Sequence, residues 1–331
     1  MFELLEKLCL VQGTPGDEGK AASLISGLME PYTDLRYTDA LGNLICHRSG
    51  SGRGRSVMFC SHMDETGFVV TFIEENGRLR IAPVGQTDPL AAAWTKVAFG
   101  GGLCGILAPD PGTKQSDFRF ENFGVDVGAR TRAEAEKLVK PGDRCVIAGG
   151  LFRLAGESLV AGKPLCNRAG CAALIEIARK LASRGDTDDE VWFVFSVQGE
   201  VGQRGAGSAA YAVRPDLSLT VETAPAGEIT GTGKKSPVPG DGAGILVRDD
   251  SVISDPGLVD ELSAAARERE VRFFYDLRTS GASDAKAVQS SGTGVKSAAL
   301  TIPVSNSRTG AEIADLRDIE AAAELAAAFV R

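Results

Sequence analysis

The order of apolar runs along the chain constrains its fold most strongly, because helical and extended patterns alternate at both ends of the sequence. Residues 17–30 and 167–185 place apolar side chains at the spacing of one helical face. The apolar runs 56–60, 190–197 and 217–222 are continuous, which is typical of strands buried on both sides. This alternation predicts an α/β fold in which a sheet is covered by helices on both faces.

The middle of the chain has a different pattern. From about residue 68 to 160 the extended segments are short and separated by glycines, and one helix is expected near residues 132–140. Short strands at close spacing are typical of small β-barrels and sandwiches. We therefore expect an α/β domain made of residues 1–67 and 161–331, interrupted by an inserted β-rich, barrel-like domain of residues 68–160.

Charge and hydropathy exclude several classes of partner. The net charge of -8 argues against nucleic acid and against an anionic membrane, because both select clustered lysines and arginines. No apolar run reaches the roughly 20 residues of a transmembrane helix. Residues 1–13 lack the cleavage site of a signal peptide, and the seven scattered cysteines form no Cys-x-x-Cys pair. These features predict a cytoplasmic protein with reduced thiols.

Residues with metal-binding or acid–base chemistry stand at the ends of the expected strands or at the start of an expected helix. Because strand ends in an α/β sheet meet at one edge, a single crevice could collect all of them. The candidates are His62, Asp64, Cys166, Glu200 and Glu222.

Each candidate has a simpler alternative. His62 and Asp64 form a His-x-Asp pair, and such a carboxylate can orient a metal-binding imidazole. The alternative is an ordinary polar histidine in a loop. Cys166 precedes the expected helix, for which a capped helix with two buried thiols is the alternative. The chain has only two histidines, and the other, His47, has no acidic neighbour in the sequence.

The order of the motifs resembles the glutamyl or deblocking aminopeptidase family, which are tetrahedral two-metal exopeptidases. The resemblance covers essentially the whole chain. It implies a zinc-exopeptidase-like domain with a mixed sheet flanked by helices, an inserted β domain for dimerisation and assembly, and release of N-terminal residues from peptides. The motifs are SHMDETGF, FENFGVDVGA, NRAGC, QGEVGQRGA, VET, SDA and ADLRDIEA.

The resemblance implies a first metal position held by His62, Cys166 and Glu222, with Asp64 orienting the histidine. Cys166 stands where the family has a bridging aspartate, and Glu222 stands where it has a shorter carboxylate. Nitrogen, thiolate and carboxylate are all acceptable zinc ligands. A single zinc ion therefore remains possible at this position.

The second metal position departs further from the family. Gly199 replaces the glutamate that acts as general base, Glu200 keeps the ligand that follows it, and Arg308 replaces the last histidine ligand. Arginine stays protonated and has no lone pair for a metal ion. We therefore expect Arg308 to occupy the second position and to pair with Glu200. Freed from metal, Glu200 is also a candidate for the base, although this ion pair would depress its basicity.

These departures predict at most one divalent metal ion per subunit, zinc by preference, or none. Two-metal aminopeptidase activity is then lost or altered. The alternatives are a homologue that binds peptides without catalysis and a structural subunit of an assembly. The expected partners are peptides and further copies of the chain, with a dimer as building block and a dodecamer as a possible shell, and neither nucleic acid nor a membrane.

Overall fold

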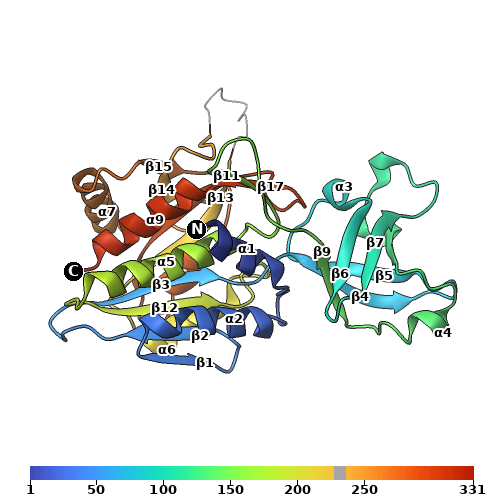
Figure 1. Ribbon diagram of the computed structural model, residues 1–331, viewed down its shortest axis with the longest axis horizontal. Helices are drawn as coiled ribbons and strands as arrows, with labels where there is room; N and C mark the ends of the chain where they lie inside the picture. Colours follow the sequence, from blue (N-terminus) through green and yellow to red (C-terminus); the bar gives the residue numbers. More distant parts are fainter. Residues whose placement is uncertain (227–235) are drawn as a thin grey trace.

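The computed structural model describes residues 1–226 and 236–331, which form an α/β body and a smaller β-barrel (Figure 1). Within these residues, an 11-stranded mixed sheet forms the centre of the α/β body. The order is β1 (Leu35–Thr38), β2 (Leu44–Arg48), β12 (Glu190–Ser196), β3 (Ser56–His62), β13 (Leu217–Pro225), β16 (Lys296–Ser305), β17 (Glu312–Asp315), β11 (Leu159–Gly162) and β10 (Phe152–Arg153), with β14 (Ala243–Arg248) on β16 and β15 (Phe273–Leu277) on β14.

The central strands β12, β3, β13 and β16 are parallel to one another, so their carboxyl ends meet at one edge of the sheet. The outer pairs β1–β2, β16–β17 and β10–β11 are antiparallel. This arrangement brings the ends of β3, β12 and β13 together, although they are far apart in the sequence.

Helices cover both faces of the sheet, and the side chains of β3 show why. Val57 and Phe59 belong to the larger core, whereas Met58 and Cys60 belong to a second core on the opposite face, as the two-residue period of a strand requires. The larger core is covered by α1 (Phe2–Leu10), α2 (Gly19–Met29), α5 (Arg168–Arg184), α7 (Pro256–Glu268) and α9 (Leu316–Phe329). The second core is covered by α6 (Arg204–Val213) and α8 (Asp284–Gln289).

Strands between Gly67 and Ile147 close an antiparallel barrel around a separate core that includes Phe68, Leu107 and Phe123. The barrel order is β4 (Gly67–Ile73), β5 (Leu79–Val84), β8 (Phe123–Asp126), β7 (Cys104–Pro109), β6 (Thr95–Phe99) and β9 (Arg144–Ile147). Short helices lie between these strands: α3 (Pro89–Ala92), η2 (Gln115–Asp117), η3 (Phe120–Asn122) and α4 (Arg132–Ala135). In the α/β body, η1 (Glu30–Tyr32) follows α2.

The expected α/β fold with a mixed sheet flanked by helices and a barrel-like β module is confirmed. The barrel is shorter than the expected insertion of residues 68–160, because β10 pairs with β11 and β11 pairs with β17 in the large sheet. The expected boundary at residue 160 therefore falls inside β11. The role of the barrel in dimerisation and assembly stays a prediction.

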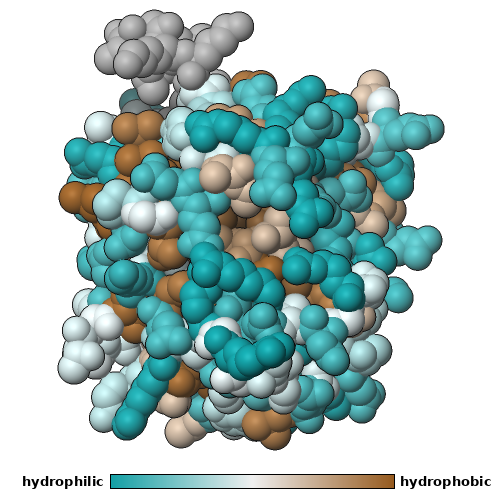
Figure 2. Space-filling view, turned by 90° about the vertical axis from the view of Figure 1, so that its left-hand side faces the viewer, coloured by the Kyte–Doolittle hydropathy of each residue, from teal (hydrophilic) through white to brown (hydrophobic). Residues whose placement is uncertain are grey.

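Hydrophilic residues predominate on the end of the molecule opposite the barrel, and hydrophobic residues are scattered among them (Figure 2). Among the residues that the structure describes, no helix combines the length and the apolar composition that a membrane span requires.

A buried ion pair joins the segment by which the chain enters the barrel to the segment between β11 and α5. Lys163 Nζ donates to Glu65 Oε2 and to the carbonyl oxygen of Thr66, both at 3.0 Å. The side chains of Lys163 and Glu65 are each 2% exposed. Arg168 Nη2 lies 3.8 Å from Glu65 Oε1, and its Nη1 donates to the carbonyl of Leu8. The start of α5 and the end of α1 are thereby tied to the same carboxylate.

We expect Lys163→Met to lower the free energy of unfolding by roughly 3–5 kcal/mol, because it removes the closest cation from a buried carboxylate. Urea unfolding followed by circular dichroism measures this change. The control is Lys114→Met, since Lys114 is exposed and its loss should change the free energy by less than about 0.5 kcal/mol. Equal effects of the two substitutions would contradict the stabilising role of the Lys163–Glu65 pair.

Candidate metal centre

The five residues singled out in the sequence lie together at the carboxyl edge of the parallel strands. His62 ends β3, Glu200 follows β12, and Glu222 lies near the end of β13. Cys166 lies two residues before α5, and Asp64 follows β3. Each is therefore placed by the end of a strand or by the approach to a helix, as the sequence predicts.

A compact set of three possible ligands is formed by His62, Cys166 and Glu200. One ligand atom from each lies within 4.8 Å of the others. Cys166 Sγ lies 3.8 Å from Glu200 Oε1. The set combines nitrogen, sulfur and oxygen donors, which are the usual ligands of zinc in proteins. The donor chemistry and spacing fit a metal ion such as zinc.

Asp64 fixes the imidazole and the tip of β12 at once. Its Oδ1 lies 3.3 Å from His62 Nδ1, which leaves Nε2 to face the other candidate ligands. Its two oxygens accept the backbone N–H groups of Gly199 and Glu200 at 2.8 and 2.9 Å. Asp64 is therefore the residue that sets the position of His62 relative to Glu200.

The acidic surroundings of His62 favour positive charge. Burial alone would lower the pKa of His62, but hydrogen bonding to Asp64 and Cys166 and the charges of Asp64 and Glu222 outweigh it, so the pKa lies well above its ordinary value. Burial also raises the pKa of the Glu200 carboxyl and of the Cys166 thiol. A bound cation would stabilise the ionised forms of both groups.

Glu222 lies on the Nε2 side of the histidine but outside the compact set. Its Oε2 is 4.0 Å from His62 Nε2 and accepts from Asn167 Nδ2 at 3.3 Å. Its Oε1 accepts the backbone N–H of Asp284 at 3.0 Å. Burial and the neighbouring charge of Asp284 raise the pKa of Glu222 to about 8. The expected set of His62, Cys166 and Glu222 is thus less compact than the set with Glu200.

Gly199 leaves no room for a side chain in this arrangement. A Cβ atom at residue 199 would lie 2.4 Å from His62 Cγ and 2.5 Å from His62 Cβ, both far inside van der Waals contact. The imidazole therefore packs directly against the backbone of the strand tip. The side chain of the expected base is absent, and its space is filled by His62.

The expected Arg308–Glu200 ion pair is wrong. Arg308 is exposed, and its Nη1 donates to Gln86 Oε1 in the loop after β5. Its backbone N–H donates to Glu312 Oε1 at 2.7 Å, in a turn where Arg308 has a φ of 65°. Among the described residues Arg308 forms no ion pair with Glu200. The turn and the amide of Gln86 together hold the guanidinium outside ion-pair distance of that carboxylate, on which its charge still acts.

Glu312 is a site residue that the sequence did not single out. It is 2% exposed, and its Oε2 accepts the backbone N–H groups of Leu165 and Cys166 at 2.6 and 3.1 Å. Burial raises its pKa to about 7. Its carboxylate holds the turn of Arg308 and the approach to Cys166 in one place. The only signal in the sequence was that Glu312 is an acidic residue shortly after Arg308, which stands at the position of the family's last metal ligand.

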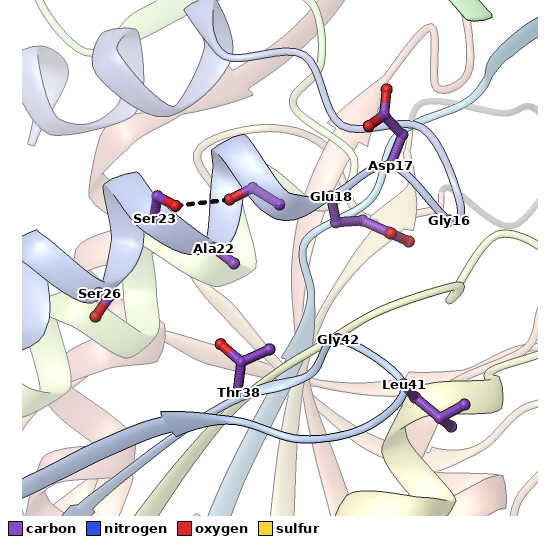
Figure 3. Close-up of a pocket in the computed structure, with 10 residues that line it drawn as sticks. Gly16, Asp17, Glu18, Ala22, Ser23, Ser26, Thr38, Leu41 and Gly42 are labelled. Atoms are coloured by element: carbon purple, nitrogen blue, oxygen red, sulfur yellow. Dashed lines mark hydrogen bonds between the residues drawn. The ribbon is translucent and has the colours of Figure 1, made fainter. Parts of the chain in front are cut away.

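Glu18 is a second missed residue, and it lies beside a hollow of about 570 Å³ between the start of α2 and the turn from Thr38 to Gly42 (Figure 3). Glu18 Oε1 accepts the backbone N–H of Gln198 at 3.0 Å. Ser23 and Leu41 also line the hollow. Glu18 therefore connects this hollow to the strand tip that carries Gly199.

The fold and this site define a class: an α/β protein with a barrel module and a candidate metal centre at the carboxyl edge of its parallel strands. The family model of the M42 glutamyl aminopeptidases matches residues 42–325, and the chain belongs to that family. The expectation of an aminopeptidase relative is confirmed.

Individual relatives agree with this family over nearly their whole lengths. The lysyl aminopeptidase of Pyrococcus furiosus is 30% identical over 343 residues, covering 99% of this chain and 96% of that protein. An aminopeptidase from Desulfurococcus kamchatkensis has a TM-score of 0.94 at 27% identity, covering 99% and 94%. The Pyrococcus horikoshii TET1 peptidase, which can assemble into a tetrahedron or a large octahedral shell, has a TM-score of 0.88 at 29% identity, covering 98% of each chain.

We expect Gly199→Ala to lower the free energy of unfolding by about 1–3 kcal/mol, because the new methyl group would collide with the His62 ring. Chemical unfolding monitored by fluorescence measures the effect. The matched control is Gly27→Ala within α2, where nothing lies within 4 Å of the added Cβ. That substitution should stabilise the helix by up to about 1 kcal/mol. The packing of His62 on Gly199 is disproved if both variants are equally stable.

Proposed function

We propose that this chain is a peptide-binding member of the aminopeptidase family in which two-metal hydrolysis is lost or strongly reduced. The observation that carries the proposal is the contact between His62 and the backbone of Gly199, which leaves no position for the family's general base. General base catalysis contributes roughly 10²–10⁴ to the rate of a hydrolysis. The family membership supports peptides as ligands.

We further propose that His62, Cys166 and Glu200 hold at most one divalent ion, with zinc preferred. Their spacing within 4.8 Å and their donor chemistry support this assignment. A zinc ion bound there would act as a Lewis acid on a carbonyl oxygen and would lower the pKa of a bound water. Asp64 orients His62, and Glu312 positions the backbone of Cys166.

A second ion lacks ligands in this proposal. Arg308 offers no lone pair at the position of the last family ligand, and its charge opposes a divalent ion nearby. The carboxylates of Asp64 and Glu222 each accept backbone N–H groups, so neither is free to replace the missing base without breaking those bonds. Of Asp64, Glu200 and Glu222, Glu200 remains as the carboxylate able to act either as ligand or as base. A single residue cannot fill both roles in one catalytic cycle.

A structural role in an assembly is the second candidate, and the surface of the barrel favours it. Contiguous patches of exposed apolar side chains mark protein–protein contacts, and large apolar side chains are exposed both on the barrel and on the α/β body. Those of the barrel are Phe72, Leu90, Trp94, Ile106 and Leu138. We propose that the barrel mediates homo-oligomerisation, with a dimer as the building block and a dodecamer as the closed shell. The shells formed by the Pyrococcus horikoshii relative support this proposal.

Metal analysis together with a panel of aminoacyl chromogenic substrates tests the catalytic proposal. We expect at most one zinc ion per subunit and no turnover above the rate of the Cys166→Ala variant, which removes one ligand. The triple variant Cys166→Asp, Gly199→Glu, Arg308→His should still show no turnover, because a side chain at residue 199 would collide with His62. Two metal ions per subunit in the unaltered protein, with turnover that Cys166→Ala abolishes, would overturn the proposal.

Light scattering after size-exclusion chromatography tests the assembly proposal. We expect a native mass that is a multiple of the dimer rather than the 34.6 kDa of one chain. Trp94→Asp should lower the mass, because Trp94 is 65% exposed on the barrel. Leu277→Asp is the control, since Leu277 is 64% exposed on β15, outside the barrel. A monomeric unaltered protein, or equal effects of both variants, would argue against the barrel as the interface.

A further inference from the structure

We propose that Arg308 recognises a carboxylate of a peptide ligand at the entrance of the candidate metal centre. The inference rests on the proposed function and deepens it, because it assigns the chemical class of the ligand group that enters the site. It depends on the placement of Arg308, on the absence of a protein carboxylate against it, and on the charge that its guanidinium presents.

The backbone of Arg308 is fixed relative to the candidate metal ligands by Glu312. One oxygen of this buried carboxylate accepts the N–H of Arg308 at 2.7 Å. The other accepts the N–H groups of Leu165 at 2.6 Å and Cys166 at 3.1 Å. The turn that carries Arg308 and the segment that carries Cys166 therefore share one anchor.

The side chain of Arg308 is placed from the opposite side by the loop after β5. Its Nη1 donates to Gln86 Oε1. The preceding residue, Gly85, packs on Glu200, since a Cβ atom at Gly85 would lie 3.1 Å from Glu200 Cβ and 3.4 Å from Glu200 Oε2. The guanidinium is thus held by Gln86, whose neighbour Gly85 packs on the candidate ligand Glu200.

The guanidinium of Arg308 forms no ion pair with a carboxylate among the residues that the structure describes, and its charge acts on Glu200 only at longer range. Its partner Gln86 is neutral and uses a single donor atom of the guanidinium. Other arginines differ: Arg55, Arg80 and Arg317 each lie within 2.8 Å of a carboxylate oxygen. A guanidinium has five N–H donors, so Arg308 keeps several for a ligand.

The chemistry of a guanidinium selects the ligand group. A planar carboxylate accepts two parallel N–H groups from arginine, which gives both attraction and a fixed orientation. The protonated amine of a peptide N-terminus would instead be repelled at this position. Because Arg308 is exposed, a ligand reaches it without a rearrangement of the core. The carboxylate comes either from the C-terminus of a short peptide or from an acidic side chain.

Isothermal titration with four blocked or unblocked probes tests the inference. Acetyl-Ala-Ala presents a C-terminal carboxylate, acetyl-Glu-amide presents a side-chain carboxylate, acetyl-Ala-Ala-amide presents neither, and Ala-Ala-amide presents only an amine. We expect at least one carboxylate probe to bind roughly tenfold or more tightly than both amides, as a charge-assisted hydrogen bond implies. The probe that binds identifies the source of the carboxylate.

Arg308→Gln should abolish this difference while leaving the melting temperature unchanged, because the side chain is exposed. Arg269→Gln is the matched control, since Arg269 is an exposed arginine at the end of α7 and should leave every affinity unchanged. Equal binding of all four probes, no binding of any probe at millimolar concentration, or full retention of the preference in Arg308→Gln would each overturn the inference.

The outcome is separable from that of the proposed function. Two metal ions per subunit together with an Arg308-dependent carboxylate preference would overturn the catalytic proposal and leave this inference standing. At most one metal ion per subunit, without a carboxylate preference, would overturn this inference and leave the catalytic proposal standing. Both measurements use the full chain as purified, and the titration needs no catalytic turnover.

Discussion

The rest of the site depends on the buried carboxylate of Asp64. Burial alone would raise its pKa, but the contact with His62 and the N–H groups of Glu200 and Gly199 outweigh that effect and lower it. The ionised group therefore joins the end of β3 to the tip of β12. Without Asp64, nothing would hold the imidazole of His62 in position relative to Glu200. A set of ligands needs such positioning by neighbouring groups to bind a metal ion tightly.

The same device recurs around the site, because carboxylates anchor the surrounding loops through backbone N–H groups. Glu312 holds the segments of Cys166 and Arg308, and Glu18 holds Gln198. Such bonds compensate part of the desolvation cost of a buried charge. These carboxylates also concentrate negative charge at the edge of the sheet where several strands end. This concentration is what makes the edge attractive to a cation, whether a metal ion or the imidazolium of His62.

The proposed function separates the fold of this chain from its chemistry. The TM-score of 0.94 to the Desulfurococcus kamchatkensis aminopeptidase, at 27% identity, shows that the backbone arrangement of the family is preserved. In the proposed function, Gly199 and Arg308 change what the strand tip and the last turn offer to a ligand, and both lie outside the strands that define the sheet. A fold of this kind therefore supports binding and assembly even where its reaction is altered.

The sequence by itself determined the α/β sheet and the barrel, because apolar periodicity is a local pattern, and it predicted that the candidate site residues would share one edge of the sheet. The tertiary structure decided that Glu200 rather than Glu222 completes the compact set with His62 and Cys166. Only the tertiary structure decided that β10 and β11 join the large sheet and that Arg308 turns toward Gln86 instead of Glu200. The physical reason is that these outcomes depend on side-chain directions and hydrogen bonds between segments far apart in the chain. Arg308 and Gln86 are 222 residues apart, and no local pattern encodes their contact.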